Sequence, residues 1–117
     1  MKPFLSAAAL LSVLMMGGDA DAHAFLLKSE PSVGATGPAP KTLRLEFSEA
    51  VELAFSGVEV AKEAGGAVAT QNVRLNGNKV LLADLPPLSA GAYRVKWHVV
   101  SVDTHRTEGD FTFSVKP

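Results

Sequence analysis

The sequence predicts an all-β fold, an immunoglobulin-like antiparallel β-sandwich or Greek-key β-barrel of about seven strands. Three observations favour this class. Apolar and polar residues alternate with a period of two in several runs, most clearly over 93–99, as expected of strands with one buried and one solvated face. Turn-forming residues separate the runs, and no helix-period pattern of useful length occurs. One compact domain follows from these features.

The first half of the domain contains three expected strands: 24–29, 41–48 and 56–62. A loop at 31–40, with three Pro and two Gly, separates the first two. In 41–48, Leu and Phe alternate with Arg and Glu, and in 56–62 two Val alternate with Glu and Ala. Each strand should therefore bury one face.

The second half contains four further expected strands: 67–73, 79–84, 91–100 and 108–116. Gly65-Gly66 precedes the first of them, and Asn76-Gly77 has the form of a tight hairpin turn. Pro86-Pro87 opens the loop before the long strand 91–100. We expect Tyr93, Trp97 and the five Phe residues after the N-terminal segment to pack in the core.

Residues 1–22 differ in composition from the rest and are typical of a secretory signal peptide. Lys2 precedes an apolar run at 4–16, and Ala20-Asp21-Ala22 has the small-x-small form of a cleavage site. An uncleaved membrane anchor is the alternative, but this run is too short to span about 30 Å of hydrocarbon. We therefore expect export, cleavage after Ala22 and a functional domain at 23–117.

The charge balance and the distribution of sulfur exclude several classes of function. The chain has 11 basic and 12 acidic residues, a formal net charge of −1 and a pI near 6.3, which argues against a nucleic-acid-binding module. The absence of Cys excludes disulfides, a thiol nucleophile and Cys-ligated metal sites. The three methionines, Met1, Met15 and Met16, all lie in the expected leader. A metal site in the exported domain must therefore use nitrogen and oxygen ligands.

His23 becomes chemically distinctive if cleavage follows Ala22. As the first residue it offers a free α-amine and an imidazole to the same ion, and both groups release protons near neutral pH. A frayed terminus is the ordinary alternative. A rival site, Ala22-His23-Ala24, would place the cut after Ala24 and remove His23.

Asp103 and His105 form a second candidate element just after the strand 91–100. In extended backbone, residues two apart project to the same side, so both could reach one ion. The alternative is a polar turn in which Asp103 caps backbone N–H groups and His105 is solvated. If the fold brings His23 to the same pole, the set of three nitrogens and one oxygen suits tetragonal Cu(II), then Ni(II). Zinc prefers tetrahedral closure.

Two further side chains, His98 and Glu49, could in principle belong to this metal site. His98 shares its strand face with Arg94 and Lys96, which predicts a solvated surface histidine. Glu49 ends the strand 41–48 and could approach the same pole. We regard it as a group near the ion rather than as a ligand.

Six stretches of the chain are recognisable together: 23–31, 45–49, 55–57, 90–97, 100–105 and 109–115. In this order and spacing they resemble the CopC family of periplasmic copper-resistance proteins. The likeness runs from His23 to the C-terminus. It implies a small β-sandwich or barrel that binds one Cu(II) through the amine and imidazole of His23, an oxygen of Asp103 and the imidazole of His105.

The resemblance also implies a role in the cell. Glu49 matches a family glutamate near the copper site. Periplasmic location, copper homeostasis, resistance or delivery, and an inner-membrane copper permease of the CopD type as partner are expected on this basis. Some members carry a Met-rich loop that binds Cu(I), but the corresponding stretch 62–70 has neither Met nor His. Without thioether sulfur a Cu(I) site is chemically implausible, so a single Cu(II) site is expected.

Two other classes of function stay open. The first is an exported immunoglobulin-like interaction module without metal, which cleavage after Ala24 would favour. The second is a copper enzyme of the polysaccharide-monooxygenase type, which also uses an N-terminal His. An Asp ligand and the supply of only one Trp and one Tyr argue against it. We expect a binding protein and no catalysis.

Overall fold

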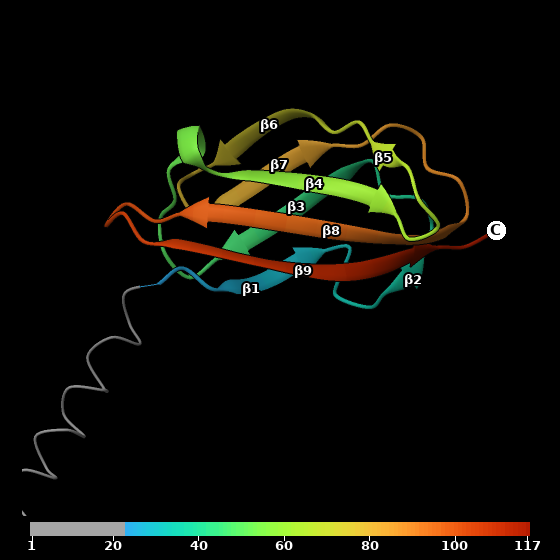
Figure 1. Cartoon of the computed structure of the whole chain (residues 1–117), viewed down its shortest axis with the longest axis horizontal. Helices are drawn as coiled ribbons and strands as arrows, with labels where there is room; N and C mark the ends of the chain where they lie inside the picture. The colour runs from blue at the N-terminus through green and yellow to red at the C-terminus, as the bar shows by residue number, and fades with distance from the viewer. Residues whose placement is uncertain (1–22) are drawn as a thin grey trace, which may run out of the picture.

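The computed structural model describes residues 23–117 as two β-sheets packed face to face (Figure 1). The four-stranded sheet has the order β1 (Leu26–Glu30), β3 (Thr42–Phe47), β7 (Val80–Asp84) and β6 (Gln71–Asn76). The five-stranded sheet has the order β2 (Thr36–Gly37), β9 (Arg106–Val115), β8 (Gly91–Val100), β4 (Gly57–Lys62) and β5 (Ala67–Val68). A short 3₁₀ helix, η1 (Leu53–Phe55), precedes β4. The predicted all-β sandwich is thereby confirmed.

The expected leader, residues 1–22, lies outside the described residues. Between residues 23 and 117 no helix has the length and apolar character needed to cross a membrane.

The expected strand 67–73 is the main difference from the sequence-based assignment. Its first part, β5, pairs with β4 in the five-stranded sheet, whereas β6 pairs with β7 in the other sheet. The chain therefore passes from one sheet to the other at residues 69–70. Asn72 has a positive φ of 56°, and the β6–β7 register is irregular between Gln71 and Arg74. Strands commonly change sheets through bends and bulges of this kind.

The core lies between the inward faces of β3, β7, β8 and β9. Tyr93 stacks on Phe113 with ring centroids 5.4 Å apart, and the Tyr93 hydroxyl donates to the carbonyl oxygen of Ser89 at 2.6 Å. The expectation that all the aromatic residues pack inside is wrong for Phe25 and Phe55, which are exposed. Phe25 precedes β1 and Phe55 belongs to η1, so neither occupies an inward strand position.

Gly109 makes room for Trp97 at the side of the core. The two residues are directly paired between β8 and β9. A Cβ atom on Gly109 would lie 2.6 Å from Cζ2 and 3.0 Å from Cε2 of the indole. The indole also packs edge to face with the Phe47 ring, with the ring centroids 5.2 Å apart. We expect Gly109→Ala to lower the free energy of unfolding by about 1–3 kcal/mol, because the wedged ring must move.

Urea denaturation followed by fluorescence of Trp97, the only tryptophan, measures this effect. Gly37→Ala is the matched control, since no atom lies within 4 Å of a Cβ placed at Gly37. Equal stability of the Gly109→Ala variant and the wild type would contradict the packing described.

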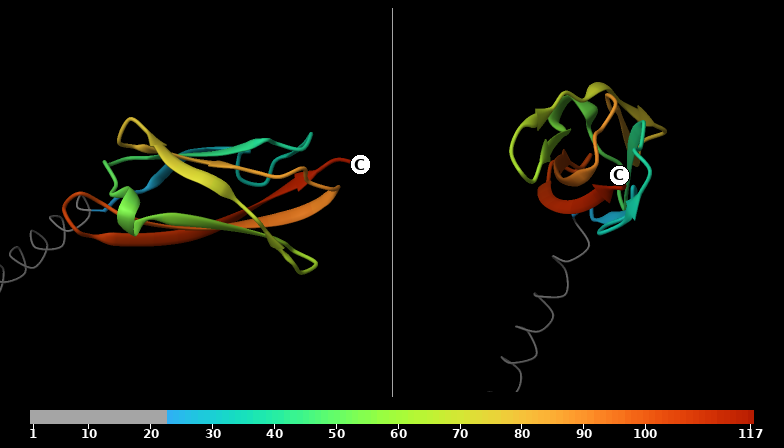
Figure 2. Two further views of the ribbon diagram at one scale, coloured as in Figure 1. Left: turned by 90° about the horizontal axis from the view of Figure 1, so that it is seen from above. Right: turned by 90° about the vertical axis from the view of Figure 1, so that its right-hand side faces the viewer.

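The two ends of the sandwich are built from different segments. In Figure 1 the chain enters at residue 23 beside the β8–β9 turn, while the β4–β5 turn and the C-terminus lie at the opposite end. The view from above in Figure 2 shows the same separation. We call the end formed by residues 23–25, 48–52 and 101–105 the N-terminal pole.

Candidate metal centre

The backbone that follows His23 is fastened to the body of the domain. Ala24 is 1% exposed and lies in the core, and its carbonyl oxygen accepts a hydrogen bond from Thr107 Oγ1 at 2.9 Å. The Phe25 N–H donates to Ser48 Oγ at 2.8 Å, and the Phe25 carbonyl accepts from the Ser48 N–H at 2.8 Å. These contacts argue against a frayed end at this position.

The imidazole of His23 has one buried atom without a partner. Its Nδ1 makes no hydrogen bond within the described part of the chain, and buried polar atoms are rarely left unpaired. The ring meets that of His105 edge to face, with centroids 4.9 Å apart. Nδ1 is also the ring nitrogen that can close a six-membered chelate with the residue's own α-amine, through Cα, Cβ and Cγ. The unpaired atom is therefore the one that an N-terminal histidine would use for an ion.

Asp103 and His105 lie on the turn between β8 and β9. The Ser101 N–H donates to the His105 carbonyl at 2.8 Å, and the Thr104 N–H donates to the Ser101 carbonyl at 2.8 Å. Thr104 has a φ of 74°, in the left-handed region, as in a three-residue hairpin loop that ends in a bulge. The backbone is thus not extended, contrary to the assumption made from the sequence. The two side chains nevertheless meet, with Asp103 Oδ1 3.4 Å from His105 Nδ1.

The surroundings of Asp103 favour its ionised form. The Ser101 hydroxyl donates to Oδ1 and is the main reason why the pKa of Asp103 lies below its usual value; burial opposes this shift. The ring and backbone N–H of His105 lower the pKa further, so the capping role considered for Asp103 is also partly present. Because Asp103 faces Nδ1 of His105, Nε2 is the nitrogen left for an ion.

Glu49 is brought to the N-terminal pole by its neighbours. Ser48 is hydrogen-bonded to Phe25, and the Ala50 carbonyl accepts from the Val102 N–H at 3.1 Å. Glu49 therefore lies between the segment that follows His23 and the turn that carries Asp103 and His105. Its side chain is exposed and has no ion pair or hydrogen bond to residues 23–117.

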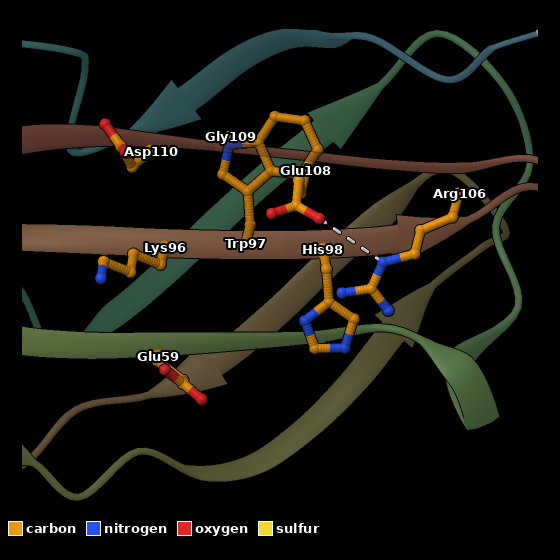
Figure 3. A pocket seen from close by; sticks show the side chains of 8 residues that line it. All are labelled: Glu59, Lys96, Trp97, His98, Arg106, Glu108, Gly109 and Asp110. Carbon is orange, nitrogen blue, oxygen red and sulfur yellow. Dashed lines mark ion pairs between the residues drawn. The ribbon is translucent and has the colours of Figure 1, made fainter.

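His98 lies on the outer face of the five-stranded sheet, away from these residues. A Cβ atom on Gly57 would lie 2.9 Å from Cε1 of His98, so the ring rests half-buried over that glycine. Figure 3 shows it in a hollow next to the 3.6 Å ion pair between Arg106 and Glu108, with Glu59 farther along β4. None of His23, Asp103 and His105 lines this hollow.

The candidate ligands are neighbours, but their side chains are not arranged around one common point. Throughout residues 23–117, no three His, Asp or Glu side chains already stand at the spacing that a metal ion needs. His23 neighbours His105, and His105 neighbours Asp103. In the 117-residue chain the nitrogen of His23 is part of the peptide bond to Ala22, so the amine becomes available only after cleavage.

The sequence pattern does not single out the residues that hold this arrangement. Ser48, Ser101 and Thr107 are small hydroxyl residues at strand ends, a common type in a common place. Only the Ser-x-Asp spacing of Ser101 and Asp103 signals a local side-chain hydrogen bond.

Comparison with known proteins gives the family of this chain. The CopC domain family matches residues 26–116. The chain is 39% identical over 114 residues to Protein YobA of Escherichia coli strain K12, covering 94% of this chain and 92% of that protein. It is 33% identical over 111 residues to Copper resistance protein C of Pseudomonas syringae pv. tomato, covering 88% of each.

Solved structures agree with the sequence relatives. The crystal structure of CopC from Methylosinus trichosporium OB3b has a TM-score of 0.76 and 33% identity, covering 81% of this chain and 95% of that one. PcoC, a methionine-rich copper resistance protein from Escherichia coli, has a TM-score of 0.74 and 35% identity, covering 81% and 100%. On both sequence and structure, this chain belongs to the CopC family of copper-resistance proteins.

Proposed function

We propose that this chain is exported to the periplasm, where it holds one Cu(II) ion at the N-terminal pole and takes part in copper homeostasis, resistance or delivery. The ligands are the α-amine and Nδ1 of His23, a carboxylate oxygen of Asp103 and Nε2 of His105. The observation that carries the proposal is the buried, unpartnered Nδ1 of His23 beside the ring of His105.

The donor set is the reason for choosing copper. Three nitrogens and one oxygen suit tetragonal Cu(II), which also heads the affinity order of divalent first-row metals, with Ni(II) next. The loop 62–70 at the opposite end of the sandwich contains no Met and no His, so no thioether there can hold Cu(I). Because no second copper site is proposed, Cu(II) enters and leaves at the N-terminal pole. Glu49 lies near the ion there without binding it.

The burial of Ala24 supports cleavage after Ala22. A cut after Ala24 would remove a core methyl group and the carbonyl that accepts from Thr107. A mature chain that starts at His23 keeps both. An inner-membrane copper permease of the CopD type is the proposed partner for delivery, and catalysis is not part of the proposal.

A Cu(II) titration of the chain processed from its own leader tests this function. Mass spectrometry should show His23 as the first residue and one copper per chain. The electron paramagnetic resonance (EPR) spectrum should be that of a tetragonal site with three nitrogens and one oxygen. A chain that starts at Phe25, or one that starts at His23 and binds no copper, would favour the metal-free interaction module instead. Oxygen-dependent cleavage of a glycan by the copper-loaded chain would favour the enzyme.

The affinity for Cu(II) should fall as the pH falls from about 8 to 5. The amine and both imidazoles bind protons in competition with the metal, and up to about three protons are displaced per ion. Asp103 does not cause this loss, because its pKa is below the usual value and the carboxylate stays charged throughout this range. Competition titrations at several pH values measure the slope. A pH-independent affinity would be incompatible with nitrogen ligation.

A further inference from the structure

Ser101 is a buried polar residue at the base of the turn that carries Asp103 and His105. It is 1% exposed, and its backbone forms an isolated antiparallel bridge to Val51, so it belongs to the body of the sandwich rather than to the exposed turn. Its hydroxyl donates to Asp103 Oδ1 and lies 3.2 Å from the His105 carbonyl oxygen. Its backbone N–H and carbonyl bind His105 and Thr104. One buried residue thus makes hydrogen-bonding contacts with Asp103, Thr104 and His105.

The side chains of Asp103 and His105 are half-exposed, at 51% and 47%. Side chains this exposed ordinarily sample several rotamers, and ordering them on binding costs free energy. Thr104 is a β-branched residue in the left-handed region, a conformation that costs about 1–3 kcal/mol and persists only where its surroundings impose it. The turn is therefore held in its present shape by its base, and the Ser101 hydroxyl is the link from that base to the Asp103 carboxylate.

We infer that Ser101 is a positioning residue of the copper site, acting through Asp103 to fix its carboxylate beside His105 before the ion arrives. The inference rests on the proposed function and extends it to a residue that is not itself a ligand. Hydrogen-bond partners of metal ligands typically contribute about 10–100-fold to metal affinity.

Ser101→Ala removes only the hydroxyl oxygen and keeps the backbone bonds of the turn. The dissociation constant for Cu(II) should rise about 10–100-fold. The EPR spectrum should broaden or shift, because the oxygen ligand is no longer held in one place. In the metal-free chain, NMR signals of the Asp103 amide and the His105 ring should also shift.

Ser56→Ala is the matched control. The Ser56 hydroxyl donates to the Glu52 carbonyl at 2.7 Å and accepts from the Val100 N–H at 3.1 Å, close to the same end of β8. It contacts neither Asp103 nor His105. This variant should lose about as much thermal stability as Ser101→Ala, but keep the copper affinity and EPR spectrum of the wild type.

A double-mutant cycle with Asp103→Ala separates positioning from general support. If Ser101 acts through Asp103, Ser101→Ala should change the affinity less than about 2-fold when Asp103 is already absent. An equal loss of affinity in both backgrounds would overturn this inference and leave the proposed function standing. So would a Ser101→Ala chain with the Cu(II) affinity and EPR spectrum of the wild type. A wild-type chain that starts at His23 and fails to bind Cu(II) would overturn the proposed function and this inference together.

Discussion

A chain with a single N-acetylated glycine added before His23 should bind Cu(II) at least about 100-fold more weakly than the chain that begins at His23. The addition turns the α-amine of His23 into an amide and, because the glycine is acetylated, brings no new free amine. It therefore removes one ligand of the proposed site and the chelate ring with Nδ1. Loss of a residue that merely supports a ligand costs about 10–100-fold, so loss of a ligand should exceed that range. Competition titration at constant pH measures the difference.

The control adds a glycine at the other terminus, after Pro117. The C-terminus lies at the end of the sandwich opposite the N-terminal pole (Figure 1), so the affinity should be unchanged. The unprocessed chain with residues 1–22 attached should behave like the N-terminally extended one. If either extended form bound Cu(II) as tightly as the chain starting at His23, the amine would have to be removed from the ligand set.

The fold was predictable where one strand keeps a single role along its length. The expected range 91–100 is β8 itself, and 41–48 differs from β3 by one residue at each end. Alternation shows which face of a strand is buried, but it does not show with which sheet the strand pairs. For this reason the continuous pattern over 67–73 gave no sign that β5 and β6 belong to different sheets.

The candidate site was predictable in its residue types and not in its geometry. Asp103 and His105 were paired by their spacing, but the left-handed Thr104 could not be expected, because glycine is the usual residue at such a position. The anchor that fixes the His23 segment joins Thr107 to Ala24 across 83 residues of sequence. No local pattern encodes such a contact, since it depends on the packing of both sheets.

His105→Ala is expected to be the second large effect, again a loss of about 100-fold or more in Cu(II) affinity, since a ligand is removed rather than its support. In the proposed site the ring provides Nε2 to the ion, and its centroid lies 4.9 Å from that of the His23 ring, so the variant should also disturb His23. The nitrogen hyperfine pattern in the EPR spectrum should show one nitrogen fewer. Titration and spectra on the same samples test both statements.

His98→Ala makes the same chemical change on the same β8–β9 hairpin and is the matched control. Its ring lies over Gly57 on the outer face of the five-stranded sheet, outside the N-terminal pole, so copper affinity and spectrum should stay as in the wild type. The opposite result, a loss in His98→Ala with none in His105→Ala, would move the site to the hollow of Figure 3, where Glu59 and Glu108 also lie. The two histidines therefore distinguish between the two places on this domain where an imidazole and carboxylates occur together.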